Sequence, residues 1–145
     1  MSPPDDLTWL ALTVYLEAEG ESYEGKLAVA HCIVNRSRLR KKSIADTVFS
    51  AWQFSAWNTD SPRRLALDSI HKIAWDDCVK VSLAAMHGAE ADPTGGATHY
   101  LNTVATRAAR KYGDLPEWAR DPKSPTEVDP TKLTKVIGKH TFLIA

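Results

Sequence analysis

Residues 7–36 constrain the fold more than any other stretch, because two helical patterns meet there at a short acidic turn. Apolar residues recur at helical spacing in the first part, which predicts a helix over residues 6–19 with one buried face. Gly20 ends this helix, and Ser22 is a suitable N-cap for a second helix over residues 23–39. The second helix is apolar around most of its circumference, so we expect it to lie largely inside the protein.

Three carboxylates stand where these two helices meet. Glu17 falls on the last turn of the first helix, near its buried face, and Glu19 and Glu21 flank it in the turn. A carboxylate at the end of a buried helix can have a raised pKa and act as a proton donor. The alternative is that all three are solvated turn residues, with Glu21 placed favourably near a helix N-terminus. Spacing alone leaves both interpretations open.

Composition and charge set the broad class. The 145 residues fit one domain spanning residues 1–145, and 43% hydrophobic with 25% charged residues is ordinary for a globular protein. We expect no membrane span, because no apolar run approaches the roughly 18–20 residues that a span needs. The 18 basic and 18 acidic residues cancel, which argues against a nucleic-acid partner. We expect a monomer.

Metal and thiol chemistry receive little support from the residue spacing. Cys32 and Cys78 each lie within a helical pattern, so we expect buried thiols, although a disulfide stays open. The chain has no CxxC, HxxxH or HExxH spacing, and we expect neither a metal site nor a cofactor. A basic run suits either a solvated helix end or contact with an anionic polymer. Its members are Arg36, Arg38, Arg40, Lys41 and Lys42.

The rest of the pattern predicts a mainly α fold with a small antiparallel β element. The two β segments are expected to pair, which would make His99 and His140 neighbours. In order, we expect a short helix over 43–50, a loop over 51–62, a helix over 65–86, a strand over 98–102, a surface segment over 103–134 with one helical turn near 116–120, and a β-rich segment over 135–144.

Aromatic and amide side chains gather in the loop over residues 51–62, where Gln53, Phe54 and Ser55 lie between Trp52 and Trp57. A sugar stacks its apolar ring face on aromatic side chains, while its hydroxyl and acetamido groups take hydrogen bonds. The loop therefore suits a glycan. The alternative is that its aromatic residues only anchor a long loop to the core.

Five blocks, in order and over nearly the whole chain, resemble the SleB-type cell wall hydrolase family, named for spore-cortex-lytic enzymes. These blocks are YLEAEGESYEGKLAVAHCIVNR, QFS, GATHYLN, LPEWA and IGKHTFLIA. The resemblance implies a lysozyme-like fold and cleavage of the β-1,4 bond between N-acetylmuramic acid and N-acetylglucosamine in peptidoglycan. Glu17 matches the catalytic glutamate of the family. Glu19 stands where the family commonly has Arg, and its negative charge would tend to raise the pKa of Glu17.

The resemblance further implies a lytic transglycosylase, which leaves a 1,6-anhydro-muramic end. Such an enzyme needs only one carboxylate, whereas a hydrolysing glycosidase normally uses two across the bond. We therefore take Glu17 as the acid and then the base, with Glu21 as a possible second carboxylate. The candidates for contacts with the glycan strand are Glu21, Gln53, Phe54, Ser55, Tyr100, Asn102, Trp118 and His140.

Two other functions compete with this interpretation. His99, His140 and a carboxylate would suit zinc in an N-acetylmuramoyl-L-alanine amidase, which cuts the peptide from the glycan. A non-catalytic glycan-binding module is the third class. Whatever the function, the contact candidates also have structural interpretations, in which Tyr100 is a plain core residue like Phe142 and His140 only bonds a backbone carbonyl.

The setting in which the protein works is a further expectation. The N-terminus has neither a basic region nor an apolar core, so we expect no signal peptide and synthesis in the cytoplasm of a host cell. A bare catalytic domain of this kind suits a phage or prophage endolysin that reaches the wall through a holin. Delivery by a virion is the alternative.

Overall fold

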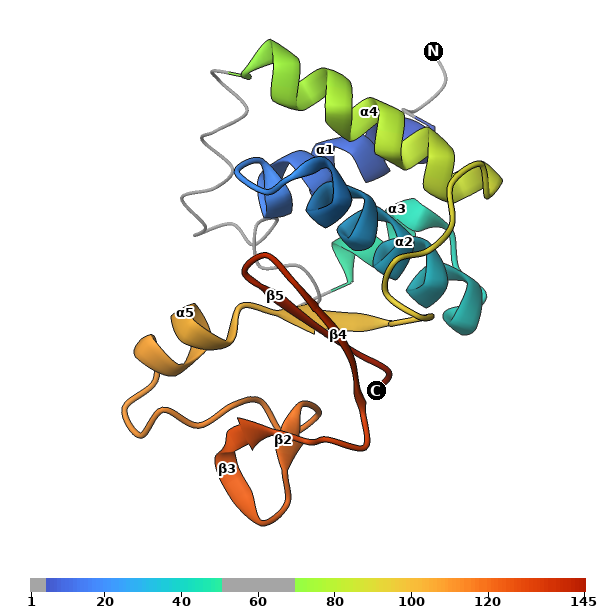
Figure 1. Ribbon diagram of the computed structural model, residues 1–145. Coiled ribbons are helices and arrows are strands. Elements are labelled where there is room, and N and C mark those ends of the chain that lie inside the picture. The colour runs from blue at the N-terminus through green and yellow to red at the C-terminus, as the bar shows by residue number, and fades with distance from the viewer. Residues whose placement is uncertain (1–4, 51–69) are drawn as a thin grey trace.

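The computed structural model describes residues 5–50 and 70–145. Four helices, α1 to α4, pack on one side of a three-stranded antiparallel sheet, and a two-stranded sheet lies on its other side, while α5 lies beyond the end of the first strand (Figure 1). The mainly α fold with a small antiparallel β element is thus confirmed. The elements in chain order are α1 (Asp6–Ala18), α2 (Tyr23–Arg40), α3 (Ile44–Phe49), α4 (Lys72–His87), β1 (His99–Leu101), α5 (Thr103–Ala108), β2 (Arg120–Asp121), β3 (Ser124–Val128), β4 (Leu133–Ile137) and β5 (His140–Leu143).

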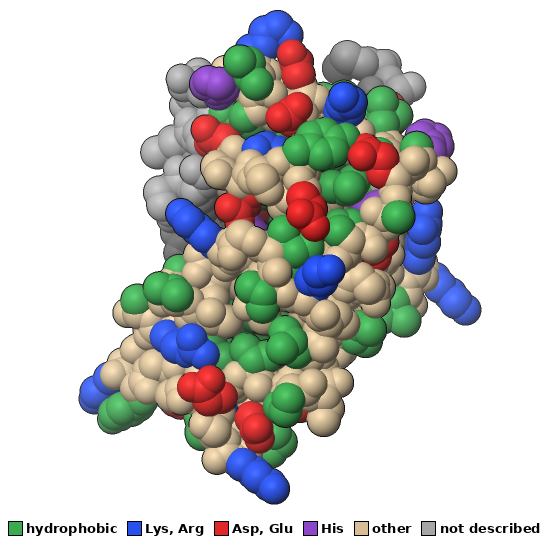
Figure 2. Space-filling view, in the orientation of Figure 1, with side chains coloured by type: hydrophobic (Ala, Val, Ile, Leu, Met, Phe, Trp, Pro, Cys, Tyr) green, Lys and Arg blue, Asp and Glu red, His purple; other side chains and the backbone are tan. Residues whose placement is uncertain are grey.

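Charged side chains of both signs are scattered over the face shown in Figure 2.

Most of the basic run at the end of α2 is exposed, as expected of a solvated helix end. Arg36 is the exception, because only 3% of it is exposed and its Nε donates a hydrogen bond of 2.6 Å to the Thr98 carbonyl. Its inclusion in a solvated run was therefore wrong. No helix in the described part of the chain is long and apolar enough to cross a membrane.

The first two helices agree with the sequence within one residue at each end, because their end signals are local. The Asp5 carboxylate caps α1 by accepting the Thr8 N–H at 3.0 Å. Ser22 Oγ caps α2 by accepting the Gly25 N–H at 3.1 Å. Both helices pack against α4, which closes the helical layer.

The predicted helix over 65–86 is wrong at its start. Residues 65–69 lie outside the described residues, and α4 begins only at Lys72, after a non-helical Ile70 and His71. Two isoleucines extended the apolar pattern too far toward the N-terminus. Ile70 is 42% exposed and Ile73 is 71% exposed, so neither belongs to the core face of this helix.

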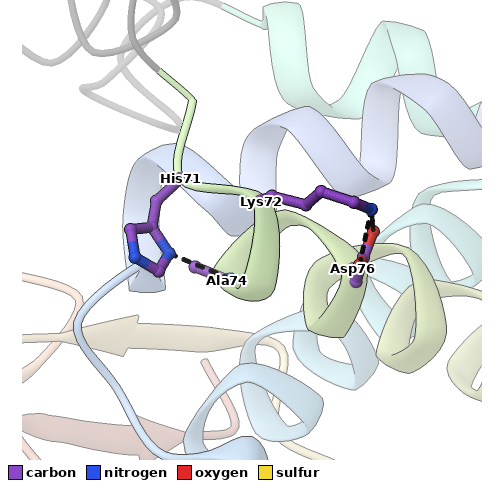
Figure 3. Close-up of polar contacts among 4 residues, drawn as sticks. All are labelled: His71, Lys72, Ala74 and Asp76. Atoms are coloured by element: carbon purple, nitrogen blue, oxygen red, sulfur yellow. Dashed lines mark hydrogen bonds and ion pairs between the residues drawn. The ribbon is translucent and has the colours of Figure 1, made fainter.

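His71 marks the true start of α4. Its Nδ1 accepts a long hydrogen bond of 3.4 Å from the Ala74 N–H, while its own N–H donates to the Tyr15 hydroxyl at 2.8 Å. One turn further on, Lys72 and Asp76 form an exposed ion pair at 2.9 Å (Figure 3). The imidazole therefore serves as the N-cap of α4, although histidine is not among the residue types preferred at this position.

The three-stranded sheet has the order β1-β5-β4, so β5 is central. The predicted antiparallel pairing of residues 98–102 with the C-terminal segment is confirmed, with Leu101 opposite Thr141. The C-terminal segment is a hairpin and not one strand. Gly138 has a φ of 57°, which is the left-handed conformation that a tight reversal needs.

The two faces of this sheet carry different side chains, because residues alternate along a strand. Tyr100 is paired with Phe142, and both belong to the core shared with the helices. His99 is paired with Leu143 and faces the second sheet, whereas His140 lies on the same face as Phe142. His99 and His140 therefore point to opposite faces, and their predicted proximity is wrong.

The surface segment expected over residues 103–134 contains more structure than predicted. It forms α5, then a turn in which Ala119 N–H donates to the Pro116 carbonyl at 2.9 Å, then the β2–β3 hairpin. The turn agrees with the helical turn expected near 116–120. Leu115 and Ala119 are fully buried in a second small core, so this segment covers the sheet instead of projecting into solvent.

The cysteines are both free and buried, as expected. Burial raises the pKa of Cys32 to about 12 and that of Cys78 to about 12, so both stay as thiols at neutral pH. They belong to the main core between the helices. Their role is packing.

Candidate active site

A cleft of about 330 Å³ opens where the α1–α2 turn faces the tip of the β4–β5 hairpin. This is at the small end of the size range of ligand sites, ~300–1,000 Å³. Its walls come from segments far apart in the sequence, and three carboxylates, one lysine and one histidine are among them. The lining residues are Leu16, Glu17, Ala18, Glu19, Gly20, Glu21, Asn102, Lys139 and His140.

Glu17 lies on the last turn of α1, which points its side chain into the cleft. The helix buries Val14 and Tyr15 completely, or nearly so, in the core, and this anchoring fixes the position of its last turn. Glu17 itself is half-buried, with one carboxylate oxygen out of contact with solvent. The apolar periodicity of the sequence is therefore what places a carboxylate at the inner end of the cleft.

The Tyr100 hydroxyl lies behind Glu17 and is itself buried. Burial raises the pKa of Tyr100 well above its ordinary value, and the charge of Glu17 and a side-chain hydrogen bond to it act in the same direction. The hydroxyl therefore keeps its proton at neutral pH and serves as a hydrogen-bond donor beside the carboxylate. Tyr100 also packs against the main core, which agrees with the alternative that it is a core residue, and its proposed contact with the glycan stays a prediction.

Arg36 is a buried cation in the same neighbourhood. Burial lowers its pKa, while the negative charge of Glu17 opposes that shift. Its hydrogen bond to the Thr98 carbonyl ties α2 to the residue before β1. The signal that sequence reasoning missed was an arginine inside an otherwise apolar helix, which marks a buried partner more often than a solvated end.

Glu21 joins the two walls of the cleft. Its Oε1 accepts the Lys139 N–H at 2.9 Å and lies 3.3 Å from His140 Nδ1, the latter within ion-pair range but outside hydrogen-bond geometry. Burial lowers the pKa of His140, and the Glu21 carboxylate partly opposes this. The side chains are 12% exposed for Glu21 and 10% for His140, so both are shielded from solvent.

Most candidates from the sequence that the structure describes meet at this cleft. Glu21, Asn102 and His140 line it together with Glu17, and Tyr100 adjoins it. Asn102 Oδ1 caps α5 by accepting the Ala105 N–H at 3.0 Å, a structural role that was not predicted. Lys139 and Glu19 line the cleft without having been singled out as contact residues.

One of the described candidates, Trp118, is not brought to this cleft. Trp118 lies against His99, with ring centroids 5.0 Å apart, on the opposite side of the sheet from His140. Gln53, Phe54 and Ser55 lie outside the described residues. Their proposed contacts with a glycan stay predictions.

A family model described as Cell Wall Hydrolase matches residues 20–143 of this chain. The chain belongs to the cell wall hydrolase family. The match starts three residues after Glu17, so it includes Glu21, Asn102 and His140 but not the candidate acid. The resemblance read from the sequence is thus confirmed at the level of the family.

Curated relatives of this cell wall hydrolase include spore cortex-lytic enzymes. That of Halalkalibacterium halodurans is 33% identical over 100 residues, which are 68% of this chain and 27% of the relative. That of Bacillus subtilis is 37% identical over 82 residues, or 50% of this chain and 26% of the relative. The chain therefore spans about a quarter to a third of the length of the curated relatives that it matches.

Two solved structures share the fold over most of its length. One is the catalytic domain of the germination-specific lytic transglycosylase SleB from Bacillus anthracis, with 27% identity, a TM-score of 0.63, and 98% of this chain and 96% of that chain covered. The other is the catalytic domain of the Bacillus cereus SleB protein, with 27% identity, a TM-score of 0.61, and coverage of 95% and 88%. The expected lysozyme-like α+β fold is confirmed.

The zinc site considered from the sequence loses its ligand pair, because His99 and His140 point to opposite faces of the sheet. Among residues 5–50 and 70–145, no group of three or more His, Cys, Asp or Glu side chains is arranged to hold a metal ion. A zinc-dependent amidase built on these two histidines is therefore not supported.

His99 should make the stability of this protein fall as the pH is lowered below about 6.5. Burial, aided by the charges of Arg36, Arg40 and Lys132, lowers the pKa of His99 to about 4. Between this value and the ordinary pKa of about 6.5, the unfolded chain binds a proton that the folded protein does not. The free energy of unfolding should thus fall by about 2 kcal/mol between pH 7 and pH 4.5 on account of His99 alone.

Urea unfolding at the two pH values measures this effect. His99→Gln should show a smaller loss than the wild type, and His87→Gln, at the exposed end of α4, should match the wild type. An equal loss in all three proteins would contradict the assignment. The lowered pKa of His140 acts in the same direction and remains in every variant.

Proposed function

We propose that this cell wall hydrolase is a lytic transglycosylase that cleaves the β-1,4 bond between N-acetylmuramic acid and N-acetylglucosamine in peptidoglycan. The observation that carries the proposal is the position of Glu17. It is a half-buried carboxylate at the end of a helix fixed in the core, it lines the cleft, and it has the buried Tyr100 hydroxyl beside it. This is the environment in which a carboxyl group can exchange a proton with a bound sugar.

Glu17 performs both proton transfers of the proposed reaction. As the acid it gives its proton to the glycosidic oxygen, the bond from that oxygen to the muramic C1 breaks, and N-acetylglucosamine leaves with a free 4-hydroxyl. As a carboxylate it then takes the proton of the muramic C6 hydroxyl, whose oxygen bonds to C1 and closes the 1,6-anhydro ring. No water is consumed, and Glu17 ends in its starting protonation state.

The Tyr100 hydroxyl supports the intermediate stage of this cycle. After the first proton transfer Glu17 is negative and partly out of water, where an anion needs a donor. The raised pKa of Tyr100 keeps its proton in place, so the hydroxyl donates a hydrogen bond to the anion instead of adding a second charge. Tyr100→Phe would remove this donor while keeping the ring.

The comparisons support the reaction class independently of Glu17. One solved relative that shares the fold over 98% of this chain is described as a germination-specific lytic transglycosylase, and three curated relatives are described as spore cortex-lytic enzymes. The catalytic assignment to Glu17 rests on the geometry of the cleft, because the family match begins after this residue.

Hydrolysis of the same bond is the second candidate function. Glu19 and Glu21 line the cleft with Glu17, and a hydrolysing glycosidase places a second carboxylate across the bond. Glu21 is already engaged by the Lys139 N–H and held close to His140. This contact favours transglycosylation, in which Glu17 acts without a second carboxylate.

Mass spectrometry of the fragments released from purified peptidoglycan separates these reactions. We expect muropeptides that end in 1,6-anhydro-muramic acid, which are 18 mass units lighter than the reducing ends that hydrolysis leaves, because one water is missing. The control is a digest of the same peptidoglycan with a hydrolysing muramidase. Reducing muramic ends alone would replace transglycosylation by hydrolysis, and released peptides without glycan cleavage would point to an amidase.

The phage or prophage origin, delivery through a holin and the monomeric state stay predictions from the sequence.

The glycan strand should lie along the cleft between Asn102 on one side and Lys139 on the other. Lys139 is exposed. Apart from His140, it is the only described lining residue that can carry a positive charge, so it suits an anionic group on the strand.

A further inference from the structure

Glu21 makes its side-chain contacts with the tip of the β4–β5 hairpin, 118 residues away in the sequence. The carboxylate accepts the Lys139 N–H at 2.9 Å and stands 3.3 Å from His140 Nδ1. Only 12% of the Glu21 side chain is exposed, so water competes little for these contacts. A hydrogen bond from a backbone N–H to a shielded carboxylate is among the stronger ones in proteins.

The backbone of Glu21 is itself held in place. Its carbonyl accepts a hydrogen bond from Lys26 Nζ, and Lys26 is only 4% exposed on the buried side of α2. Its N–H donates to the Ala18 carbonyl at 3.0 Å, which closes the α1–α2 turn. The carboxylate therefore reaches the hairpin from a fixed base.

The hairpin tip is shaped to receive this carboxylate. A Cβ at Gly138 would lie 2.8 Å from Glu21 Oε1, closer than real Cβ contacts allow. Gly138 also has a φ of 57°, which favours glycine. The turn and the close approach thus require glycine at the same position, and both serve the contact between the walls of the cleft.

The contact is connected to the candidate acid through two rings. The His140 ring meets the Tyr100 ring edge-on, with centroids 5.0 Å apart at 72°. The Tyr100 hydroxyl in turn adjoins Glu17. A hairpin that moved away from Glu21 would therefore carry His140 with it and change the support of Tyr100.

We propose that Glu21 is a positioning residue, which joins the α1–α2 turn to the hairpin tip and so sets the width of the cleft. We name this contact, of Glu21 with Lys139 N–H and His140, the Glu21 latch. Glu21 takes no part in proton transfer. The effect on catalysis rests on the proposed function, whereas the latch itself is a property of the fold and is measured without substrate.

Amide hydrogen exchange at Lys139 tests the latch directly. In the wild-type protein this N–H should be protected, and in Glu21→Ala it should exchange at least about 10-fold faster, because its acceptor is gone. The matched control is Glu24→Ala, an exposed carboxylate in the first turn of α2, which should leave the exchange unchanged. Exchange at the wild-type rate in Glu21→Ala would overturn the proposal.

Steady-state kinetics on peptidoglycan fragments test the role in positioning. Glu21→Gln keeps an oxygen that accepts the Lys139 N–H, so its kcat should stay within about threefold of the wild type. Glu21→Ala should raise KM and lower kcat together, with a loss of about 10–100-fold in kcat/KM, because the cleft is no longer held. If Glu21→Gln were as inactive as Glu21→Ala, the carboxylate would belong to the chemistry and the proposal would fail.

A double-mutant cycle links Gly138 to Glu21. Gly138→Ala should speed exchange at Lys139 in the wild-type background and have much less effect in the Glu21→Ala background, where the oxygen it would meet is absent. Additive effects would show that the two residues do not act on the same contact. If the wild-type protein released no fragments from peptidoglycan but Lys139 behaved as described, the proposed function would fail and the latch would stand.

Discussion

Replacing Glu17 with Gln is expected to slow the cleavage of peptidoglycan by about 1,000-fold or more. General acid–base catalysis by one side chain contributes about 10²–10⁴-fold, and here one carboxyl group serves both proton transfers. The amide has nearly the same shape, so α1 and the cleft should keep their structure. Turbidity clearing of a suspension of purified peptidoglycan measures the rate, and circular dichroism checks the fold.

A charge-matched control separates this effect from a general loss of negative charge. Glu24→Gln removes one carboxylate from the exposed side of α2 and should clear the suspension at the wild-type rate. Wild-type clearing by Glu17→Gln would remove Glu17 from the mechanism and redirect attention to Glu19 and Glu21, which line the same cleft.

The helical half of the fold was accessible from the sequence because its determinants are local. Periodicity and the caps at Asp5 and Ser22 define α1 and α2 within one residue. The same periodicity placed the start of α4 too early. Exposed isoleucines such as Ile73 fit the spacing of a buried helix face, and the sequence does not show that they are exposed. The cap by His71 has no sequence signature of its own.

The candidate site was accessible only in part, because its walls are built by contacts between distant residues. Glu17 could be placed by the helix that carries it, whereas the pairing of Glu21 with Lys139 spans 118 residues and leaves no local pattern. Arg36 looked like one member of a solvated run, and only the packing of α2 shows it buried. The faces of β1 and β5, which separate His99 from His140, depend on a register that no spacing predicts.

Phe142→Ala is expected to destabilise the protein by about 3–5 kcal/mol, since it opens a cavity in a close-packed core. Phe142 is fully buried on the central strand β5 and packs near the rings of Tyr100 and His140, at centroid distances of 5.9 and 6.1 Å. Its replacement removes the support of both rings and the apolar side chain with which β5 enters the main core. Thermal unfolding should show a fall in Tm of about 10 °C or more.

Val136→Ala supplies the matched control within the same sheet. Val136 is 61% exposed on the edge strand β4, so the loss of its two methyl groups should cost less than about 1 kcal/mol. Similar losses for the two variants would mean that the sheet contributes little to the main core. Because Phe142 holds the rings that lie between the Glu21 latch and Glu17, its variant should also lose activity at temperatures where it is still folded.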